Sequence, residues 1–260
     1  MTTEAWNSLV DAASFPYRRA GRFAWHFARG KLRMDPVFRH LLNQGLIAPD
    51  ARVLDIGCGQ GLLASLLQAA DAVARNGRWP AAWAAAPSRA RVTGIDLMPK
   101  DIERARAALG DSARFVCGDM RHTEFPANDT TVVFDVLHYI TVAEQNAVLA
   151  RVRSALSPGG ALLLRVGDAQ ARRGFVLSQW VDRAVTLVRG HRVMPLFCRP
   201  LMQWIATLQS LGFEVQSRPM SHGTPFANVL LVARVAEVPA AVLPGASVRR
   251  LRPVAAEMSP

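Results

Sequence analysis

A run of apolar residues that ends in a glycine-rich turn places the strongest constraint on how this chain can fold. The segment Val53–Gly61 reads VLDIGCGQG. Its first half predicts a buried β-strand. The three glycines that follow would let backbone N–H groups and the start of a helix approach a ligand closely. We therefore expect a ligand site at the point where this strand ends.

Short apolar runs alternate with helical patterns along the rest of the chain. Strands are expected at Arg52–Ile56, Arg91–Ile95, Ala113–Cys117, Thr131–Phe134, Ala161–Val166, Phe213–Ser217 and Val229–Val235. Helices are expected at Gly61–Ala74, Pro99–Leu109, Val142–Leu156 and Pro200–Leu211, and residues 4–46 read as two or three more. Because the strands are almost entirely apolar, this alternation predicts an α/β fold with a mostly parallel sheet and helices on both faces.

The length of 260 residues, half of them hydrophobic, fits one globular domain with additions at its ends. We expect a helical lid over residues 1–46, the main domain over residues 47–237 and a mobile tail over residues 238–260. The main domain contains two insertions. Residues 75–90 carry an Asn-Gly pair and two prolines, which predicts a surface loop. Residues 169–199, with a helix expected over Phe175–Val188, follow the fifth strand at the edge where such sheets bind ligands.

The composition limits where the protein is expected to act and what it is expected to bind. The N-terminus has no signal-peptide pattern and no apolar run is long enough to cross a membrane, so we expect a soluble, cytoplasmic protein. The three cysteines are far apart and form no zinc pattern, and we expect no metal site. The net charge of +11 comes mostly from residues 1–50 and 171–260. It indicates either solvated surface charge or an acidic partner.

Carboxylates stand near the ends of the first three expected strands. Asp55 lies two residues before the first glycine, where dinucleotide-binding strands are usually apolar, and the G-x-G-x-G spacing also differs from the dinucleotide fingerprint. An acid at this position suits a ligand with an ammonium group. Asp96 ends the second strand, where it could accept hydrogen bonds from a ribose diol, and Asp119 follows the third, where it could accept from the amine of adenine.

These features occur together with two further motifs. The set comprises Val53–Gly61, Gly94–Asp96, Gly118–Asp119, Phe134–Tyr139 and Leu156–Gly160. As a set it resembles the successive motifs of class I S-adenosylmethionine-dependent methyltransferases, over roughly residues 45–235. The resemblance implies a Rossmann-like sheet of seven strands whose last strand, Val229–Val235, is antiparallel. It also implies S-adenosylmethionine as the cofactor.

The resemblance assigns cofactor contacts residue by residue. The turn residues Gly57, Cys58 and Gly59 would border the methionine end of the cofactor together with Asp55. The ribose would contact Asp96 and Leu97, the adenine Asp119 and Met120, and the sulfonium Asp135 and Val136.

Methyl transfer is an in-line displacement at an activated carbon, so the protein mainly has to position the acceptor and exclude water. A base is needed only if the acceptor must lose a proton. His138 and Tyr139, after the fourth strand, are the candidate catalytic residues, against a packing role for His138. Asp168, after the fifth strand, is a candidate substrate contact.

The acceptor is expected to be a small or carrier-protein-bound organic molecule. The turn after the fourth strand lacks the prolines of enzymes that methylate nucleobase amines, and no trio of carboxylates suggests a magnesium-dependent catechol site. The segment Pro16–Arg33 interleaves cations and aromatics, and it is similar to methyltransferases of aryl polyene and xanthomonadin-type pigment clusters. That resemblance implies secondary metabolism, an aromatic acyl acceptor on an acidic carrier protein, and substrate contacts from Tyr17, Arg22 and His26. The same residues also fit an amphipathic surface helix.

Three alternatives remain open at this level. One is a cofactor-binding protein without catalysis. Another is a peripheral membrane methyltransferase of a lipid or quinone that uses Phe175–Arg199 as an interfacial helix. The third and most distant is a nicotinamide-dependent oxidoreductase. Nucleic acid is disfavoured as a partner, a membrane surface is not favoured, and the oligomeric state is not predicted.

Overall fold

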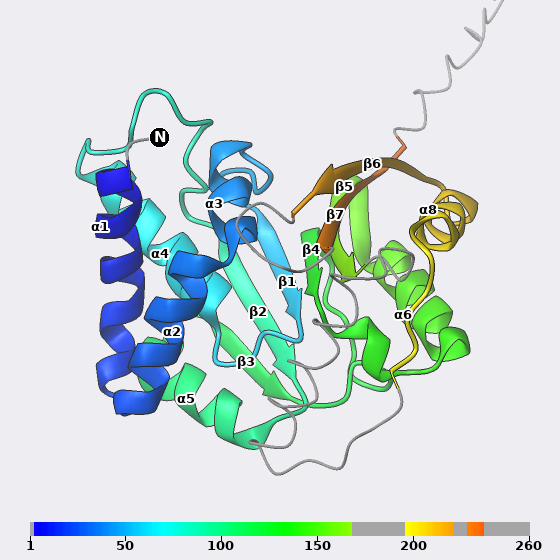
Figure 1. Ribbon diagram of the computed structural model, residues 1–260, viewed down its shortest axis with the longest axis horizontal. Coiled ribbons are helices and arrows are strands. Elements are labelled where there is room, and N and C mark those ends of the chain that lie inside the picture. Colours follow the sequence, from blue (N-terminus) through cyan, green and yellow to red (C-terminus); the bar gives the residue numbers. More distant parts are fainter. Residues whose placement is uncertain (1–2, 168–195, 221–227, 237–260) are drawn as a thin grey trace, which may run out of the picture.

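A computed structural model describes residues 3–167, 196–220 and 228–236, which fold around one seven-stranded sheet (Figure 1). The strands are β1 (Arg52–Ile56), β2 (Arg91–Asp96), β3 (Arg114–Cys117), β4 (Asn128–Phe134), β5 (Leu156–Gly167), β6 (Phe213–Pro219) and β7 (Asn228–Val235). The α-helices are α1 (Thr3–Ser14), α2 (Arg22–Met34), α3 (Pro36–Asn43), α4 (Leu62–Arg75), α5 (Pro99–Leu109), α6 (Val142–Ala155) and α8 (Leu201–Ser210). Short 3-10 helices are η1 (Phe15–Arg18), η2 (Gly110–Ser112) and η3 (Leu137–Tyr139).

The sheet has the strand order β3-β2-β1-β4-β5-β7-β6. Neighbouring strands from β3 to β5 pair in parallel, whereas β7 runs antiparallel to both β5 and β6. The predicted fold class, including the antiparallel last strand, is therefore confirmed. The order reverses between β1 and β4, and folds of this type bind ligands at such a point, beyond the carboxyl ends of the strands.

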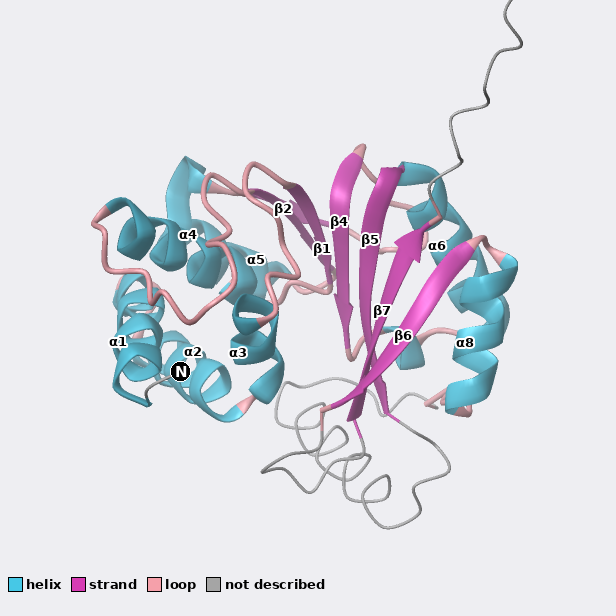
Figure 2. Cartoon of the chain, turned by 90° about the horizontal axis from the view of Figure 1, so that it is seen from above, coloured by secondary structure: helices cyan, strands magenta, loops and turns pink. Residues whose placement is uncertain are grey.

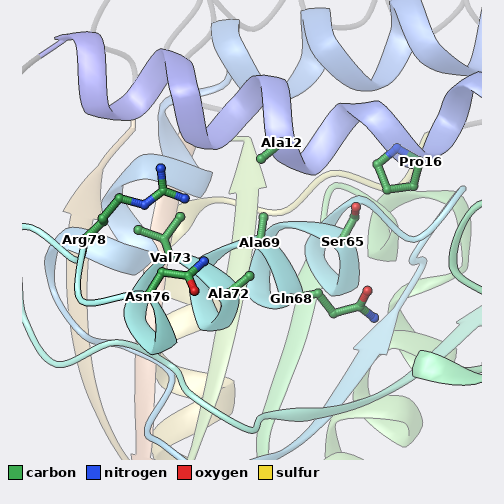
Figure 3. Close-up of a pocket in the computed structure, with 9 residues that line it drawn as sticks. All are labelled: Ala12, Pro16, Ser65, Gln68, Ala69, Ala72, Val73, Asn76 and Arg78. Carbon is green, nitrogen blue, oxygen red and sulfur yellow. The ribbon is translucent and has the colours of Figure 1, made fainter.

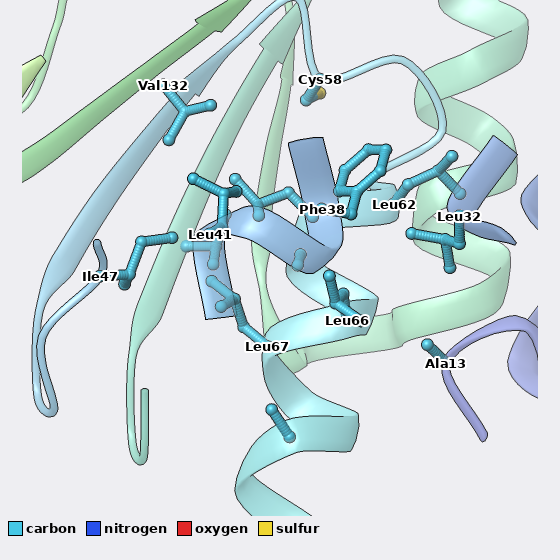
Figure 4. Packing of buried hydrophobic residues seen from close by; sticks show 14 of the residues in the cluster. Ala13, Leu32, Phe38, Leu41, Ile47, Cys58, Leu62, Leu66, Leu67 and Val132 are labelled. Carbon is cyan, nitrogen blue, oxygen red and sulfur yellow. The ribbon is translucent and has the colours of Figure 1, made fainter. Parts of the chain in front are cut away.

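Alternating side chains of the strands serve two cores, one on each face of the sheet. Val53 and Val132 face the core shared with α3, α4 and α5, whereas Leu54 and Val133 face the core shared with α6 and α8. Figure 2 shows the helices on opposite sides of the sheet, and Figure 4 shows how residues from α1 to α4 fill the first core. The sheet is thus covered on both faces, as its apolar strands require.

Local sequence signals set several helix starts. The Asp35 side chain accepts a hydrogen bond from the N–H of Val37, and Pro36 occupies the first turn of α3. Thr141 and Glu144 form a capping box at the start of α6. Both helix starts lie near the carboxyl edge of the sheet. Asp35 contacts Arg165 near the end of β5, and Thr141 follows the loop after β4.

The N-terminal helices share one continuous core with the main domain. Trp6, Leu9 and Val10 of α1 are buried in the same cluster as the sheet residue Val53. The chain from 76 to 90 contains no helix or strand, in agreement with the expected loop, but it is anchored because Trp83 is buried in that core. The lid and domain boundaries at 46 and 237 stay predictions.

Some sequence expectations differ from the structure or fall outside it. β4 begins three residues earlier than expected, because Asn128 is buried and pairs with Leu156 across an irregularity in the ladder. The expected helix Phe175–Val188, the rest of the insertion up to residue 195 and the tail from residue 238 lie outside the described residues. Within the described parts of the chain, no helix has the length and apolar character to cross a membrane.

Candidate active site

The carboxyl ends of the central strands lie level with one another, which brings their following residues to one edge. Ile56 at the end of β1 pairs with Ile95 of β2 and with Val133 of β4, and Ile95 pairs with Val116 of β3. The glycine turn, Asp96, the Gly118–Asp119 turn and Asp135 therefore follow at the same edge. This is the arrangement that the motif order predicts.

The glycine turn has a backbone that only glycine adopts easily. Gly57, Gly59 and Gly61 have φ angles of 78°, 54° and 78°, in the left-handed region that disfavours side chains. A Cβ on Gly57 would lie 2.3 Å from Val136 Cγ1, so the loop after β4 packs directly on the turn. A Cβ on Gly59 would meet no atom within 4 Å, so this side of the turn is open to a ligand. No side chain caps α4, which leaves its first N–H groups available to such a ligand.

The Asp96 side chain hydrogen-bonds to the glycine turn and also faces the site. Its Oδ2 accepts a hydrogen bond of 2.8 Å from Gly59 N, and its Oδ1 accepts one of 2.8 Å from Met98 N. A carboxylate has about four lone-pair positions, so both oxygens can still accept from a ribose diol. The insertion between α4 and β2 does not move Asp96 away, because β2 pairs with β1 along its length.

Asp55 places a carboxyl group behind the turn in a dry environment. Burial, together with the nearby charge of Asp96, raises the pKa of Asp55 to about 7. A cation bound beside these two carboxylates would reverse the shift, because it favours the ionised form of Asp55. The site is therefore matched to a positively charged ligand group.

Cys58 fills space inside the turn. Its Sγ would lie 2.8 Å from a Cβ on Gly94, so the missing side chain of Gly94 makes room for it. Burial raises the pKa of the thiol, with further contributions from Asp55 and Asp96. These observations fit an inert packing residue whose backbone belongs to the site.

The adenine-side residues form a rim at the ends of β2 and β3. Arg121 donates to both oxygens of Asp119 and, at 2.8 Å, to Glu144. The hydrogen bonds from the Arg121 side chain are the main reason why the pKa of Asp119 lies below its usual range. The Leu97 side chain is 62 % exposed at the tip of β2, and Met120 is half-buried. An exposed leucine beside polar strand ends is a suitable surface for a flat ring.

Asp135 belongs to a buried charge network that the sequence analysis missed. It is a non-glycine residue with φ of 54°, and Arg165 of β5 donates to its carboxylate, with Nε 3.0 Å from Oδ1. Arg165 also lies 2.5 Å from Asp35, which pairs with Lys31 at 2.8 Å. Burial alone would lower the pKa of Arg165, but Asp135 and Asp35 raise it above its ordinary value. The available signal was the single cation in the apolar run Ala161–Val166, since a buried charge needs a partner.

The candidate catalytic residues lie just past β4. His138 and Tyr139 belong to η3, with ring centroids 4.2 Å apart, and Tyr139 is at the boundary of exposure at 36 %. The main-chain carbonyl of His138 accepts from Phe197 N at 2.8 Å, which ties the segment that precedes α8 to this turn. Asp168 lies outside the described residues. The roles of His138 and Tyr139 stay predictions.

The N-terminal candidates divide between buried and exposed positions. Tyr17 is fully buried, and its hydroxyl donates 2.8 Å to the carbonyl of Gln60 in the glycine turn. Gln60 in turn donates through Nε2 to the carbonyl of Ala24 at 2.8 Å. Tyr17 therefore supports the turn, a function the sequence did not indicate, whereas Arg22 and His26 are exposed on α2. The substrate contacts expected for Tyr17, Arg22 and His26 stay predictions.

Two further features of the structure bear on where ligands could bind. A pocket of about 280 Å³ lies between α1 and α4 (Figure 3), and the described residues that line it include none of the predicted site residues. Within the described ranges, no group of three or more His, Cys, Asp or Glu side chains is arranged to hold a metal ion. The carboxyl edge of the sheet therefore remains the candidate site.

The strand order, the antiparallel β7 and the glycine turn with Asp55, Asp96 and Asp119 define the class I methyltransferase fold. Comparison with known proteins agrees. Residues 69–160 match a family model described as a methyltransferase domain.

The chain is similar in sequence to carboxy-S-adenosyl-L-methionine synthase of Chromohalobacter salexigens, 33 % identical over 143 residues, 51 % of this chain and 48 % of that protein. It is also 33 % identical over 116 residues to trans-aconitate 2-methyltransferase of Escherichia coli, covering 45 % of this chain and 39 % of the relative. The chain thus spans under half the length of these curated relatives.

Among solved structures, the fold is similar to that of magnesium protoporphyrin IX methyltransferase from Synechocystis PCC 6803 with bound SAH. The TM-score is 0.54 at 18 % identity, over 90 % of this chain and 99 % of that one. At this identity the likeness concerns the fold alone.

Proposed function

We propose that this protein is an S-adenosylmethionine-dependent methyltransferase that acts on a small or carrier-protein-bound organic acceptor. The observation that carries the proposal is the anionic pair Asp55 and Asp96 beside the open face of Gly59. The cofactor has an ammonium group, a sulfonium and a ribose diol, and these groups complement that pair. The methyltransferase family match and the relatives whose names include S-adenosylmethionine or methyltransferase support the same activity.

Residues of this chain fit the cofactor part by part. Asp55 and the N–H groups at the start of α4 would receive the charged methionine end, and Asp96 the ribose. The exposed Leu97 and the Asp119–Met120 turn would frame the adenine. When bound, S-adenosylmethionine supplies a methyl group already activated by its positive sulfur.

The remaining work of the protein is to orient the acceptor and exclude water. Val136 packs on Gly57, so the loop that carries His138 and Tyr139 is fixed relative to the cofactor turn. An acceptor hydroxyl could pass its proton to the His138 imidazole. An acceptor whose attacking atom carries no proton needs no base.

The direct test is methyl transfer from labelled S-adenosylmethionine, with S-adenosylhomocysteine and products followed by mass spectrometry. Label should appear in an organic acceptor, and the Asp96→Asn variant should lose most of the rate. Binding of the cofactor with no transfer to any acceptor in a panel of phenols, carboxylic acids and carrier-bound acyl groups would favour a non-catalytic binding protein instead.

A narrower proposal concerns an aromatic acyl unit on an acidic carrier protein. It rests on the cations and aromatics of α2 and on the basic charge of the chain. The α2 residue Phe23 lies against Arg104 of α5, whose guanidinium is 4.9 Å from the ring centroid. Incubation with an aryl-loaded carrier protein should label the carrier-bound aryl group. Labelling of free phenols with none on the carrier contradicts this acceptor while leaving the methyltransferase activity intact.

A further inference from the structure

A second pocket, of about 360 Å³, lies between α3 and the end of β6. This volume falls in the range of small-molecule sites. The described residues that line it are Pro36, Arg39, His40, Asn43, Arg218, Pro219 and Met220. The pocket is separate from the glycine turn and has no role in the cofactor contacts described above.

The position of this pocket connects it with the acceptor side of the sheet. Its α3 residues, from Pro36 to Asn43, recur at helical spacing and share one face. On the sheet side, Arg218 pairs with Leu230 of β7, which itself pairs with Arg165 of β5. Side chains directly opposite one another project from the same face, so Arg218 lies two strands, about 10 Å, from Arg165 on that face. The Asp35 partner of Arg165 immediately precedes the pocket residue Pro36.

The lining is cationic and contains buried polar atoms that need a partner. Arg39 and Arg218 supply the positive charge, His40 adds an imidazole, and no carboxylate is among the described lining residues. His40 Nε2 and Asn43 Oδ1 are buried with no hydrogen-bond partner in the described part of the chain. Burying such atoms is costly unless a ligand or water satisfies them. The amide of Asn43 can present either its oxygen or its N–H groups, since the two orientations are similar in shape.

The electrostatics favour a negative occupant. Burial lowers the pKa of His40, and the positive charge of Arg218 lowers it further. Arg218 Nη2 donates to Gln216 Oε1 at 3.0 Å, and the other N–H groups of a guanidinium, which has five, can still reach a ligand. An anion between the two groups would accept from both and would favour the protonated form of His40, because it offsets the charge of Arg218.

We propose that this pocket binds an anionic group, a carboxylate or a phosphate, of the acceptor molecule. The inference rests on the proposed function, because it makes the pocket a subsite for the acceptor at the same edge of the sheet. A carboxylate could belong to a small acidic acceptor, whereas a phosphate could belong to the prosthetic arm of a carrier protein. In either case the anion would anchor the acceptor near β6 and leave its other end free to extend toward β4.

Inorganic phosphate and benzoate are the probes, followed through the His40 imidazole by NMR in the full-length protein. Binding should raise the pKa of His40, and Arg218→Gln should weaken it at least tenfold. Arg114→Gln, an exposed position at the start of β3, should leave binding unchanged. A response to phosphate alone assigns the phosphate source, and a response to benzoate alone assigns the carboxylate. No response to either, or equal loss in the two variants, overturns the proposal.

A titration with S-adenosylmethionine on the same samples separates this proposal from the proposed function. Cofactor binding without anion binding overturns the subsite alone. Anion binding without cofactor binding overturns the assignment of the anion to an acceptor, together with the methyltransferase function. In an active preparation, Arg218→Gln should raise the KM of an anionic acceptor at least tenfold with little change in kcat.

Discussion

Arg165 near the carboxyl end of β5 and Asp35 at the start of α3 form an ion pair of 2.5 Å between two buried side chains. Because Arg165 also holds Asp135, this contact joins the N-terminal helices to the loop at the end of β4. Removing the cation would take the shared partner from the buried carboxylate of Asp35 and from the partly exposed carboxylate of Asp135. We therefore expect Arg165→Met to lower the free energy of unfolding by about 3–5 kcal/mol, measured by urea denaturation.

The matched control for this ion pair is Arg89→Gln. Arg89 pairs with Asp50 at 2.6 Å, but both side chains are mostly exposed. Solvent screens such a pair, so its loss should change stability far less. Equal losses in the two variants would show that the Arg165 network does not stabilise the fold.

The Arg165 network also shows what sequence reasoning could predict. The positions of the strands and of the glycine turn follow from apolar periodicity and from motifs that are local in sequence, and the antiparallel last strand is implied by the resemblance of those motifs to class I methyltransferases. The partner of Arg165 is 130 residues away, and no local pattern specifies such a contact. The same holds for Tyr17 and Gln60, because a buried hydroxyl bonded to a distant carbonyl has no periodic signature.

Gly59 should be needed for cofactor binding more than for folding. A methyl group there meets no protein atom, so Gly59→Ala should cost only the strain of a positive φ, about 1–2 kcal/mol. It would occupy the open side of the turn, so the affinity for S-adenosylmethionine should fall at least tenfold by calorimetry. Gly77→Ala is the control, since Gly77 has a φ of 66° and open surroundings outside the site. A similar affinity loss in both variants would rule out a specific role for Gly59.

The pKa of Asp55 predicts a pH dependence for cofactor binding. If the ammonium of the cofactor pairs with ionised Asp55, affinity should fall as pH decreases below about 7, approaching tenfold per unit. Calorimetric titrations over roughly pH 5.5 to 7.5 should show this slope. Asp55→Asn should bind weakly, with no slope from this group. A pH-independent affinity in the unsubstituted protein would argue against the pairing.

The same group affects the ligand-free fold in the opposite sense. The folded-state pKa of Asp55 lies above its ordinary value of 3.8, so the folded protein holds this proton more tightly than the unfolded chain does. Its contribution to stability is therefore present at low pH and is lost as pH rises from 3.8 to about 7. Chemical denaturation of Asp55→Asn, compared with the unsubstituted protein across this range, should show less loss of stability with rising pH. Identical pH profiles would contradict the assignment.

Tyr17 should support the glycine turn from the N-terminal side. Tyr17→Phe removes only the hydroxyl that donates to Gln60, so it should cost about 1 kcal/mol of stability. Because the bond holds the turn, the variant should also bind S-adenosylmethionine more weakly. Normal cofactor affinity in a destabilised Tyr17→Phe protein would restrict Tyr17 to a packing role.

The central claim is that Asp55 and the Gly57–Gly61 turn form the binding site for S-adenosylmethionine. It is tested most directly by isothermal titration of the cofactor into the unsubstituted protein and the Asp55→Asn variant at pH 7.5. The account predicts saturable binding to the first and at least a tenfold loss in the second. Failure of the unsubstituted protein to bind S-adenosylmethionine, together with binding of NAD, would contradict it.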